Sequence, residues 1–539
     1  MTGRPRRADG RRSRDLVRAG ASDLSCDLPV VETARSSGAE RRRLKARGAR
    51  IVLAGVGLQV LLYAPSLTGL FTFDDRKIVL EDASITGVAP LWDAFLRPYF
   101  SAPGATNAIA YRPATVCSLG LDARLFGLSP FAMRLENILW AGVGAGLFAL
   151  LAARLGAPPE VSWSVLALLS AHPVRSEAIV TIVGRSELMA FAFVVSAILL
   201  GQQSWRFPDA PRRVVYAAAS GAVILLALLS KESAFAAPAL LLLVSCADGA
   251  RPDLPKRQGA LHPVFIAWGA AFVAAALLRR SVLGGILTGP SFSVFPVDNA
   301  LAGLPPFDRV LAAMALLPRA AGLLLWPRTL VADYGSQAIP VSHLLTLMAV
   351  AAGAATVIAA GLIALRVRRT VPLAALGIGW VAASYLPFAN VFYPTAVLFA
   401  ERLLYTPCAG AVLAVASGLY ALGQHKGTRA ARGAALSSVV VLAFLGIFRI
   451  ESRLPEWRDD RTLFSAVVRD MPTNGRAWWN LAVVALSDRD PAVAQQCLTA
   501  ALRAEPSLRP SVESLRAHAV ELRRADLVAA IDAALASPR

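Results

Sequence analysis

Long apolar stretches recur along most of the chain, and short polar connections separate them. The first stretch, residues 51–70, has the roughly 20 apolar residues that a helix needs to cross a bilayer. The recurrence of such windows predicts an all-α fold, a polytopic membrane helical bundle. The eleven expected spans are 51–70, 131–153, 160–172, 187–204, 213–230, 233–247, 261–278, 342–365, 371–389, 403–422 and 433–450.

A further apolar segment, 308–326, is ambiguous, and the basic connections decide how it is assigned. Basic loops stay on the cytoplasmic side of a membrane. The basic connections share the side of the N-terminus only if 308–326 does not span, so we expect a re-entrant or surface-lying helix, a cytoplasmic N-terminus and an external C-terminus. The connections are the tail (Arg41, Arg42, Arg43, Lys45), Arg206–Arg213, Arg251–Arg257, Arg366–Arg369 and Lys426–Arg432.

This assignment divides the chain into three parts. Residues 1–50 form a basic tail that we expect to be disordered and cytoplasmic. Residues 51–450 form the membrane domain, and its external segments are 71–130 and 279–341. Residues 451–539 are more polar and form an external helical domain.

The external C-terminal part carries one tetratricopeptide-like unit of 34 residues. Pro472 precedes Pro506 by that same period, and a closing amphipathic helix is expected near 511–535. Because one and a half repeats and a cap are few for an independent solenoid, we expect this part to lean on the membrane domain or on a partner. The matching positions are Trp478, Leu481, Ala482, Ala494, Leu498, Ala501 and Pro506.

Composition supports a membrane protein and argues against a nucleic-acid partner. The mean hydropathy is +0.54, and only 17% of residues are charged, against about a quarter in soluble domains. The formal net charge of +19 would suggest nucleic-acid binding in a soluble protein, but here the basic residues gather in the tail and the loops. The five cysteines form no closely spaced pair, so neither a metal site nor a disulfide framework is expected.

Two adjacent carboxylates, Asp74 and Asp75, follow directly on the first expected span. They are either a solvated interfacial loop or a functional pair, in which one acts as general base on an acceptor hydroxyl and the other orients it. If the reaction at this pair were the transfer of a sugar from a lipid phosphate, the leaving phosphate would need cations beside it. Arg112 lies on the same external segment, and a planar guanidinium suits bidentate phosphate binding.

Other polar residues stand beside apolar runs, and each has a structural alternative. Lys231 either points at lipid phosphate or pairs with Glu232 in a tight turn, and Arg402 either contacts phosphate or sugar or anchors to headgroups. Asp333 either binds sugar hydroxyls or caps a turn. The cluster of His172, Glu177, Arg185 and Glu187 is functional, or else an ion-pair network among Arg175, Glu177, Arg185 and Glu187 fixes a helical hairpin.

The serial order of these motifs resembles the transmembrane-and-tetratricopeptide-repeat protein O-mannosyltransferases, within the GT-C class of glycosyltransferases. The resemblance covers roughly residues 51–510. It rests on Phe73-Asp74-Asp75, Tyr111-Arg112-Pro113, Ala171-His172-Pro173 with Glu177, Gly184-Arg185 and Glu187, Ser230-Lys231-Glu232, Asp333-Tyr334, Glu401-Arg402-Leu403-Leu404-Tyr405 and the C-terminal repeat.

The resemblance implies a lipid-phosphate sugar donor, typically of mannose, and a protein Ser or Thr hydroxyl as acceptor. Asp74 and Asp75 would take the catalytic role. Arg112, Arg185, Lys231 and Arg402 become candidates for the donor phosphate. The residues expected to bind sugar or acceptor, or to support the site, are His172, Glu177, Glu187, Asp333, Tyr334 and Glu401.

The resemblance also leaves several points open. The Ala- and Arg-rich composition favours a bacterial source, and therefore an inner-membrane protein with a periplasmic external side and a polyprenol carrier. An Asp–Asp pair would suit a divalent cation, but the branch that the chain resembles needs none, so no metal or cofactor is expected. The alternatives to a transferase are a lipid-linked sugar transporter or flippase and a membrane-anchored repeat scaffold.

Overall fold

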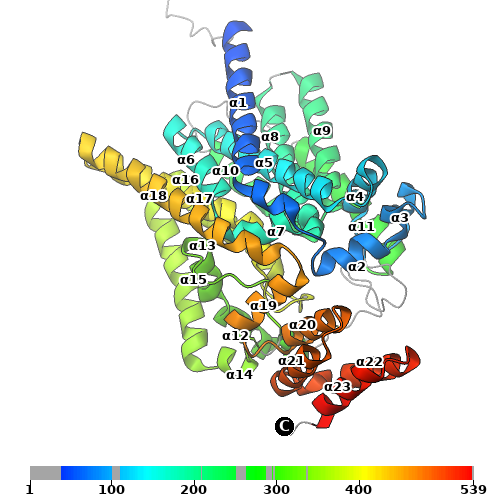
Figure 1. Cartoon of the computed structure of the whole chain (residues 1–539). Coiled ribbons are helices and arrows are strands. Elements are labelled where there is room, and N and C mark those ends of the chain that lie inside the picture. The colour runs from blue at the N-terminus through cyan, green and yellow to red at the C-terminus, as the bar shows by residue number, and fades with distance from the viewer. Residues whose placement is uncertain are drawn as a thin grey trace, which may run out of the picture. The chain divides into compact units, whose positions relative to one another are not determined.

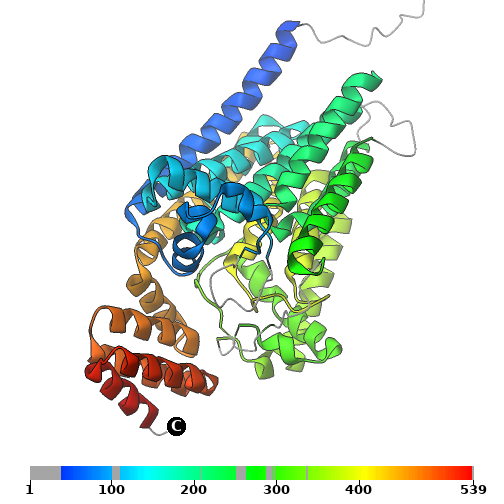
Figure 2. The same ribbon diagram turned by 90° about the vertical axis from the view of Figure 1, so that its right-hand side faces the viewer.

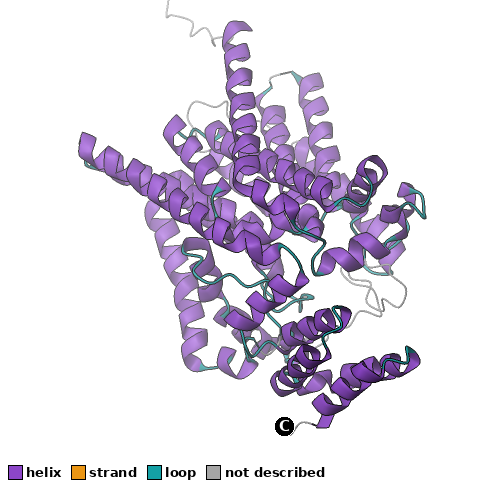
Figure 3. Ribbon diagram, viewed as in Figure 1, coloured by secondary structure: helices purple, strands orange, loops and turns teal. Residues whose placement is uncertain are grey.

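The computed structural model describes residues 38–99, 110–207, 209–249, 263–286, 294, 298–335 and 338–536. The basic connection 251–257 and the first 37 residues of the expected tail lie outside this part. The chain divides into two compact units, residues 1–47 and 48–539, and the contacts below all lie within the second. Every regular element in the described residues is a helix (Figure 3), as the apolar pattern predicts.

The membrane-type bundle is built from long helices joined by short helical turns (Figure 1). Its elements in chain order are α1 (Gly38–Tyr63), η1 (Ala64–Thr68), α5 (Pro130–Arg154), α6 (Pro159–Ser170), η3 (Pro173–Arg175), α7 (Ser176–Val180), η4 (Ile182–Gly184), α8 (Arg185–Arg206), α9 (Ala210–Leu228), η5 (Glu232–Ala236), α10 (Ala237–Gly249), α11 (Pro263–Leu283), α15 (Leu347–Val367), α16 (Pro372–Tyr385), η7 (Leu386–Phe388), η8 (Glu401–Leu404), α17 (Tyr405–His425), α18 (Arg429–Arg453) and η9 (Leu454–Trp457).

Two longer insertions and the C-terminal region add shorter helices. The insertion after η1 holds α2 (Asp74–Glu81), α3 (Ala83–Thr86), η2 (Leu91–Phe95) and α4 (Pro113–Phe126). The insertion after α11 holds η6 (Ala300–Gly303), α12 (Pro306–Ala315), α13 (Leu317–Leu325) and α14 (Val341–Leu344). The C-terminal helices are α19 (Asp460–Asp470), α20 (Gly475–Ser487), α21 (Pro491–Ala504), η10 (Pro506–Leu508), α22 (Arg509–Glu521) and α23 (Ala525–Ala536).

The described residues contain nine helices that are long and apolar enough to cross a membrane. They differ in how much of their apolar surface the protein itself covers. The span at Ile182–Arg206 is 78% buried within the protein, whereas the span at Leu347–Val367 is 6% buried. Leu347 and Leu362 on α15 are largely exposed. A helix that exposes apolar side chains all round suits a lipid environment, so α15 lies at the periphery and α8 at the centre.

Two of the eleven expected spans, 160–172 and 371–389, are not among these nine long helices. They correspond to α6 with 12 residues and α16 with 14, fewer than the roughly 17 that span a bilayer unaided. Arg154 at the end of α5 bonds to Gln203 near the end of α8, whereas Glu177, which follows α6, lines the cavity beside the start of α8. The chain therefore runs from one face of the bundle to the other through α6, despite its length.

The ambiguous segment 308–326 is not one continuous helix. It forms α12 and α13, which meet at Leu316, just before Pro318. A proline inside a helix removes one backbone hydrogen bond and clashes with the preceding turn, which explains the break. Each piece has ten residues or fewer, so neither can span alone.

Close packing of α1 against α5 fixes the chain where it enters the first insertion. A methyl group at Gly142 or Gly146 would approach the Cα atoms of Val56 and Val52 to 2.5 Å, so only glycine fits. Small residues four apart are typical of such close helix contacts in membranes. The end of α1 and the Phe73–Asp75 turn that follows are thereby held at a defined position.

The C-terminal helices pack as successive antiparallel pairs (Figures 1 and 2). The expected tetratricopeptide unit corresponds to α20 and α21, which pack on each other, and α23 packs against α21. Ala482, Ala494 and Leu498 from this unit are buried in one cluster with residues of α22 and α23, and Ala501 is also fully buried. The small side chains allow the two helices to approach closely, as the sequence pattern predicts.

Candidate active site

A cavity of about 600 Å³ lies where the first insertion, the bundle, the second insertion and the C-terminal helices meet. Side chains from all four regions line it, although they are hundreds of residues apart in the sequence. The charged residues that line it are Asp74, Lys77, Arg112, Glu177, Glu187, Lys231, Glu232, Arg279, Asp298, Asp333, Arg402 and Arg476. Eight of the twelve site residues expected from the sequence line this cavity, namely Asp74, Arg112, Glu177, Glu187, Lys231, Asp333, Tyr334 and Arg402.

Asp74 begins α2 and faces the cavity. Phe73 before it has a φ of +51°, which is rare for a side-chain-bearing residue, and its N–H donates to the Asp460 carboxylate at 2.7 Å. The Asp74 side chain forms no hydrogen bond or ion pair with any other described residue. Burial raises its pKa above the ordinary value, while Arg402 and Arg476 act in the opposite direction. Asp74 is therefore a half-buried carboxylate that lines the cavity and has no bonded partner in the described part of the chain.

Asp75, in contrast, is fully buried and does not line the cavity. Its carboxylate accepts the backbone N–H of Val183 at 2.9 Å and lies 3.5 Å from the backbone nitrogen of Thr72. Burial raises its pKa to about 6, although these backbone donors oppose the shift. Successive residues of a helix point about 100° apart, and here Asp74 faces the cavity while Asp75 points toward η4. Asp75 ties the start of α2 to η4 and thereby orients Asp74.

The expected phosphate-binding cations in the cavity are each paired with a glutamate. Lys231 Nζ lies 2.7 Å from Glu187, and Arg402 Nη1 lies 2.6 Å from Glu177. Burial lowers the pKa of Lys231, while Glu187 opposes that shift. The Arg402 side chain is 26% exposed toward the cavity. Both cations therefore combine a fixed position with a face that an anion can reach.

Arg112 belongs to a second charged group around Glu232. Glu232 accepts from Arg112 at 2.8 Å and from Arg279 at 3.0 Å, so this group carries one positive charge in excess. The Arg112 guanidinium also lies over the Tyr99 ring, 4.7 Å from its centroid. A cationic group fixed by one carboxylate and one ring is suited to bind an anion.

Sequence reasoning missed Arg476, which reaches the cavity from α20. Its guanidinium forms a bidentate pair with Asp333, with Nε 2.9 Å from Oδ2, and also bonds to Asp298. Arg476 and Asp333 lie 143 residues apart in the chain. No local pattern identifies such a pair, because Arg476 sits in an ordinary helix of the repeat unit.

Arg185, expected to bind phosphate, lies outside the cavity and is completely buried. Its donors go to Asp122 at 2.6 Å, to Glu136 at 3.0 Å, and to Asn137, Ser118 and the Met133 carbonyl. A buried guanidinium with every side occupied cannot bind a ligand without losing these bonds. Arg185 therefore has a structural position, but its acidic partners are Asp122 and Glu136 rather than the expected Glu177 and Glu187, and its bonds connect α4, α5 and α8.

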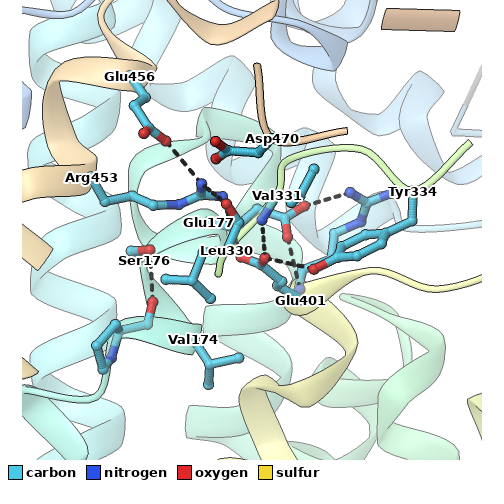
Figure 4. A network of polar contacts seen from close by, with 12 residues as sticks. Val174, Ser176, Glu177, Leu330, Val331, Tyr334, Glu401, Arg453, Glu456 and Asp470 are labelled. Atoms are coloured by element: carbon cyan, nitrogen blue, oxygen red, sulfur yellow. Dashed lines mark hydrogen bonds and ion pairs between the residues drawn. The ribbon is translucent and has the colours of Figure 1, made fainter. Parts of the chain in front are cut away.

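Glu401 and His172 are also held within the protein rather than in the cavity lining. Glu401 accepts from the Tyr334 hydroxyl at 3.0 Å and from the Val331 N–H, and Arg453 lies 3.3 Å away (Figure 4). His172 Nε2 lies 3.0 Å from the Leu324 carbonyl, and burial lowers the His172 pKa to about 4. A neutral imidazole is therefore expected at neutral pH. Both residues lie behind the cavity wall. Glu401 bonds to Tyr334, which lines the cavity itself.

Among the described residues, the cavity thus combines Asp74, a carboxylate without a bonded partner, with paired cations, an arrangement suited to deprotonating a hydroxyl beside a bound anion. In the described part of the chain, no group of three or more His, Cys, Asp or Glu side chains is placed to hold a metal ion. Carboxylates and guanidinium groups that alternate around a cavity also suit the hydroxyl groups of a sugar, which both donate and accept.

Comparison with known proteins gives relatives but no matching family model and no significantly similar solved structure. The human protein O-mannosyl-transferase TMTC3 is 26% identical over 454 residues, which cover 79% of this chain and 48% of the human protein. Protein O-mannosyl-transferase F38B6.6 of Caenorhabditis elegans is 26% identical over 450 residues (82% and 60%). Protein O-mannosyl-transferase Tmtc2 of Drosophila melanogaster is 31% identical over 295 residues (52% and 30%).

The chain spans about half the length of the curated relatives it matches. These three relatives are animal proteins, so they do not support the bacterial source expected from the composition. The chain is therefore similar, over about four fifths of its own length, to proteins named protein O-mannosyl-transferases.

Proposed function

We propose that this protein moves a mannosyl residue from a polyprenyl-phosphate carrier to Ser or Thr hydroxyls of protein acceptors. The names of the relatives support the sugar and the protein acceptor. The helical bundle beside a charged cavity supports a lipid-borne donor. We further propose a GT-C type of bundle, a tetratricopeptide-like C-terminal part, and a bacterial inner membrane with the cavity on its external side.

In the proposed reaction, Asp74 accepts the proton of the acceptor hydroxyl as its oxygen attacks the anomeric carbon. The bond from that carbon to the phosphate oxygen breaks, and polyprenyl phosphate leaves with the bonding electrons. Attack from the face opposite the phosphate inverts the anomeric centre. Arg112, Lys231 and Arg402 stabilise the growing negative charge on the leaving phosphate, and each such contact supports about 10²-fold in rate or more.

One observation carries this proposal: Asp74 has no bonded partner among the described residues and lines a cavity in which Lys231 and Arg402 are held by glutamates. Arg402 connects the two functions, because its charge lowers the pKa of Asp74 and also that of Lys231. Base and phosphate cations therefore lie within electrostatic reach of one another. A transporter would instead place its charged residues along a path through the bilayer midplane, and a scaffold would need no such cavity.

The proposal is tested by mass spectrometry of the external proteome from cells that lack the gene. The cells are complemented with the wild-type protein, with Asp74→Asn, or with the remote control Arg516→Gln. We expect hexose on Ser or Thr of a defined set of proteins with the wild type and the control, and its loss with Asp74→Asn. Equal glycosylation in all strains would contradict a transferase and favour the transporter or scaffold.

A further inference from the structure

The C-terminal helices contribute a wall of the cavity rather than standing apart from it. Arg476, in the first turn of α20, lines the cavity with its side chain 20% exposed. It is held by Asp333 and Asp298, which come from the second insertion. The Arg476 guanidinium, a charged group of the cavity, thus comes from a region that the sequence assigns to a separate repeat domain.

The C-terminal helices also contact the second insertion through Asn474, two residues before Arg476. Asn474 caps the start of α20 by accepting from the Ala477 N–H at 3.0 Å, and its amide donates to the Asp333 carbonyl at 2.9 Å. A methyl group at Gly335 would lie 2.8 Å from the Asn474 side-chain oxygen, so the two segments are in close contact. The position of Arg476 is therefore fixed by a helix cap and a tight backbone approach.

The first insertion is held by α19, the C-terminal helix that precedes α20. Asp460 accepts from the Phe73 N–H at 2.7 Å and pairs with Arg76 at 3.1 Å. The Phe73 and Phe464 rings pack edge to face with centroids 5.7 Å apart. The C-terminal helices therefore contact both Phe73, the residue before Asp74, and Asp333, the partner of Arg476.

We propose that Arg476 is a positioning residue of the transfer reaction, supplied by the C-terminal helices to set the charge and the wall beside Asp74. This inference rests on the proposed function. One guanidinium between two aspartates leaves a negative excess beside Asp74, and Arg476 limits that excess. Consistent with this role, Arg476 opposes the rise that burial imposes on the pKa of Asp74, whereas Asp333 reinforces it.

Other charged groups also face Asp74, and the test must separate Arg476 from them. Arg402 favours the anionic form of Asp74, and Glu177 disfavours it. Lys77 lies one turn further along α2 and lines the same cavity. Substitutions that change only the Arg476 group, on either side of its ion pair with Asp298, keep these other charges constant.

The experiment measures mannosyl transfer by the full-length protein in lipid nanodiscs as a function of pH, with polyprenyl-phosphate mannose and a Ser/Thr-rich acceptor protein. Removal of the cation in Arg476→Gln raises the pKa of Asp74, so the acid limb of the kcat profile moves to higher pH by about half a unit. Asp298→Asn removes an anion and moves the limb to lower pH. We expect kcat of Arg476→Gln to fall about tenfold at neutral pH, with the donor KM changed less than about twofold.

Arg516→Gln, in an exposed pair with Asp532 on α22 and α23, is the matched control and keeps the wild-type profile. Asp298 is 38% exposed, so its substitution leaves the fold intact and keeps the test valid if Arg476→Gln is unstable. An unmoved acid limb in both variants would overturn the inference, even with reduced activity, because it would indicate a purely structural role. Absence of transfer by the wild type would overturn the proposed function itself.

Discussion

Arg402 and Arg185 stand in similar sequence surroundings, each within two residues of a glutamate at the start of an apolar helix, yet they lie in different kinds of site. Arg402 has one acidic partner, Glu177, and a side chain that is 26% exposed toward the cavity. Arg185 has no exposed surface and bonds to two acids, an amide, a hydroxyl and a carbonyl. The comparison teaches that a cation near a membrane helix is available to a ligand only if its own bonds leave a face open.

The two aspartates after the first span repeat this contrast at shorter range. Asp74 faces the cavity and bonds to no other residue that the structure describes, whereas Asp75 accepts a backbone N–H from another segment. The largest difference in transfer activity is therefore expected between variants of these two neighbouring residues. We expect Asp74→Asn to lower transfer by about 10³-fold or more and Asp75→Asn to lower it about tenfold.

In vitro transfer with purified protein measures this difference, and size-exclusion chromatography confirms that both variants remain folded. The isosteric change to Asn is the same in both, so it controls for the substitution itself. Equal losses for the two variants would break the distinction between a base and a residue that orients it.

The same substitution at the two arginines gives the next largest effect. Lys at position 185 cannot reach the spread acceptors, so Arg185→Lys should lower the free energy of unfolding by about 3 kcal/mol. Arg402→Lys keeps the pair with Glu177 and most of the stability, but raises the donor KM about tenfold, because the planar fork for phosphate is lost. Thermal unfolding and transfer kinetics on both variants test whether the stability loss occurs at position 185 and the rise in donor KM at position 402. A stability loss at position 402 as large as that at 185 would contradict it.

The free energy of unfolding should depend on pH through Asp75, and it should be larger in mild acid. Its pKa rises from 3.8 to about 6 on folding, so the folded state binds the extra proton between these values and stability falls as pH rises through that window. The wild type should lose about 1–2 kcal/mol between pH 4 and pH 6 relative to Asp75→Asn. Unfolding midpoints across this range measure it. Parallel pH profiles of the two proteins would show that Asp75 is not shifted.

The smallest effect is expected at His172, which supports the wall only. Its pKa of about 4 leaves it neutral at neutral pH, and it bonds to the Leu324 carbonyl. His172→Asn should change transfer less than about twofold and cost about 1 kcal/mol of stability, as expected for one lost hydrogen bond. A large loss of transfer without a stability change would place His172 in the reaction instead.

The sequence predicts the fold class and most of the cavity because apolar periodicity and charge at helix ends are local signals. Eight expected site residues meet around one cavity. The roles of Asp75 and Arg185 depend on which way each side chain points, and the expectation of a loop at Asp74 hid the start of α2 there. Arg476 could not be found, since its partner Asp333 lies 143 residues away. The sequence also predicts the crossing at 160–172, and the contacts at the two ends of the short helix α6 agree with it.

The central claim is that the cavity cations hold the donor phosphate while Asp74 faces the reacting carbon. An experimental structure of the Asp74→Asn protein in nanodiscs with polyprenyl-phosphate mannose tests it most directly. The account predicts phosphate density within hydrogen-bonding distance of Arg402 and of Lys231 or Arg112, with the sugar beside residue 74 and the lipid leaving between bundle helices. Phosphate bound elsewhere, with the sugar out of reach of residue 74, would contradict the account.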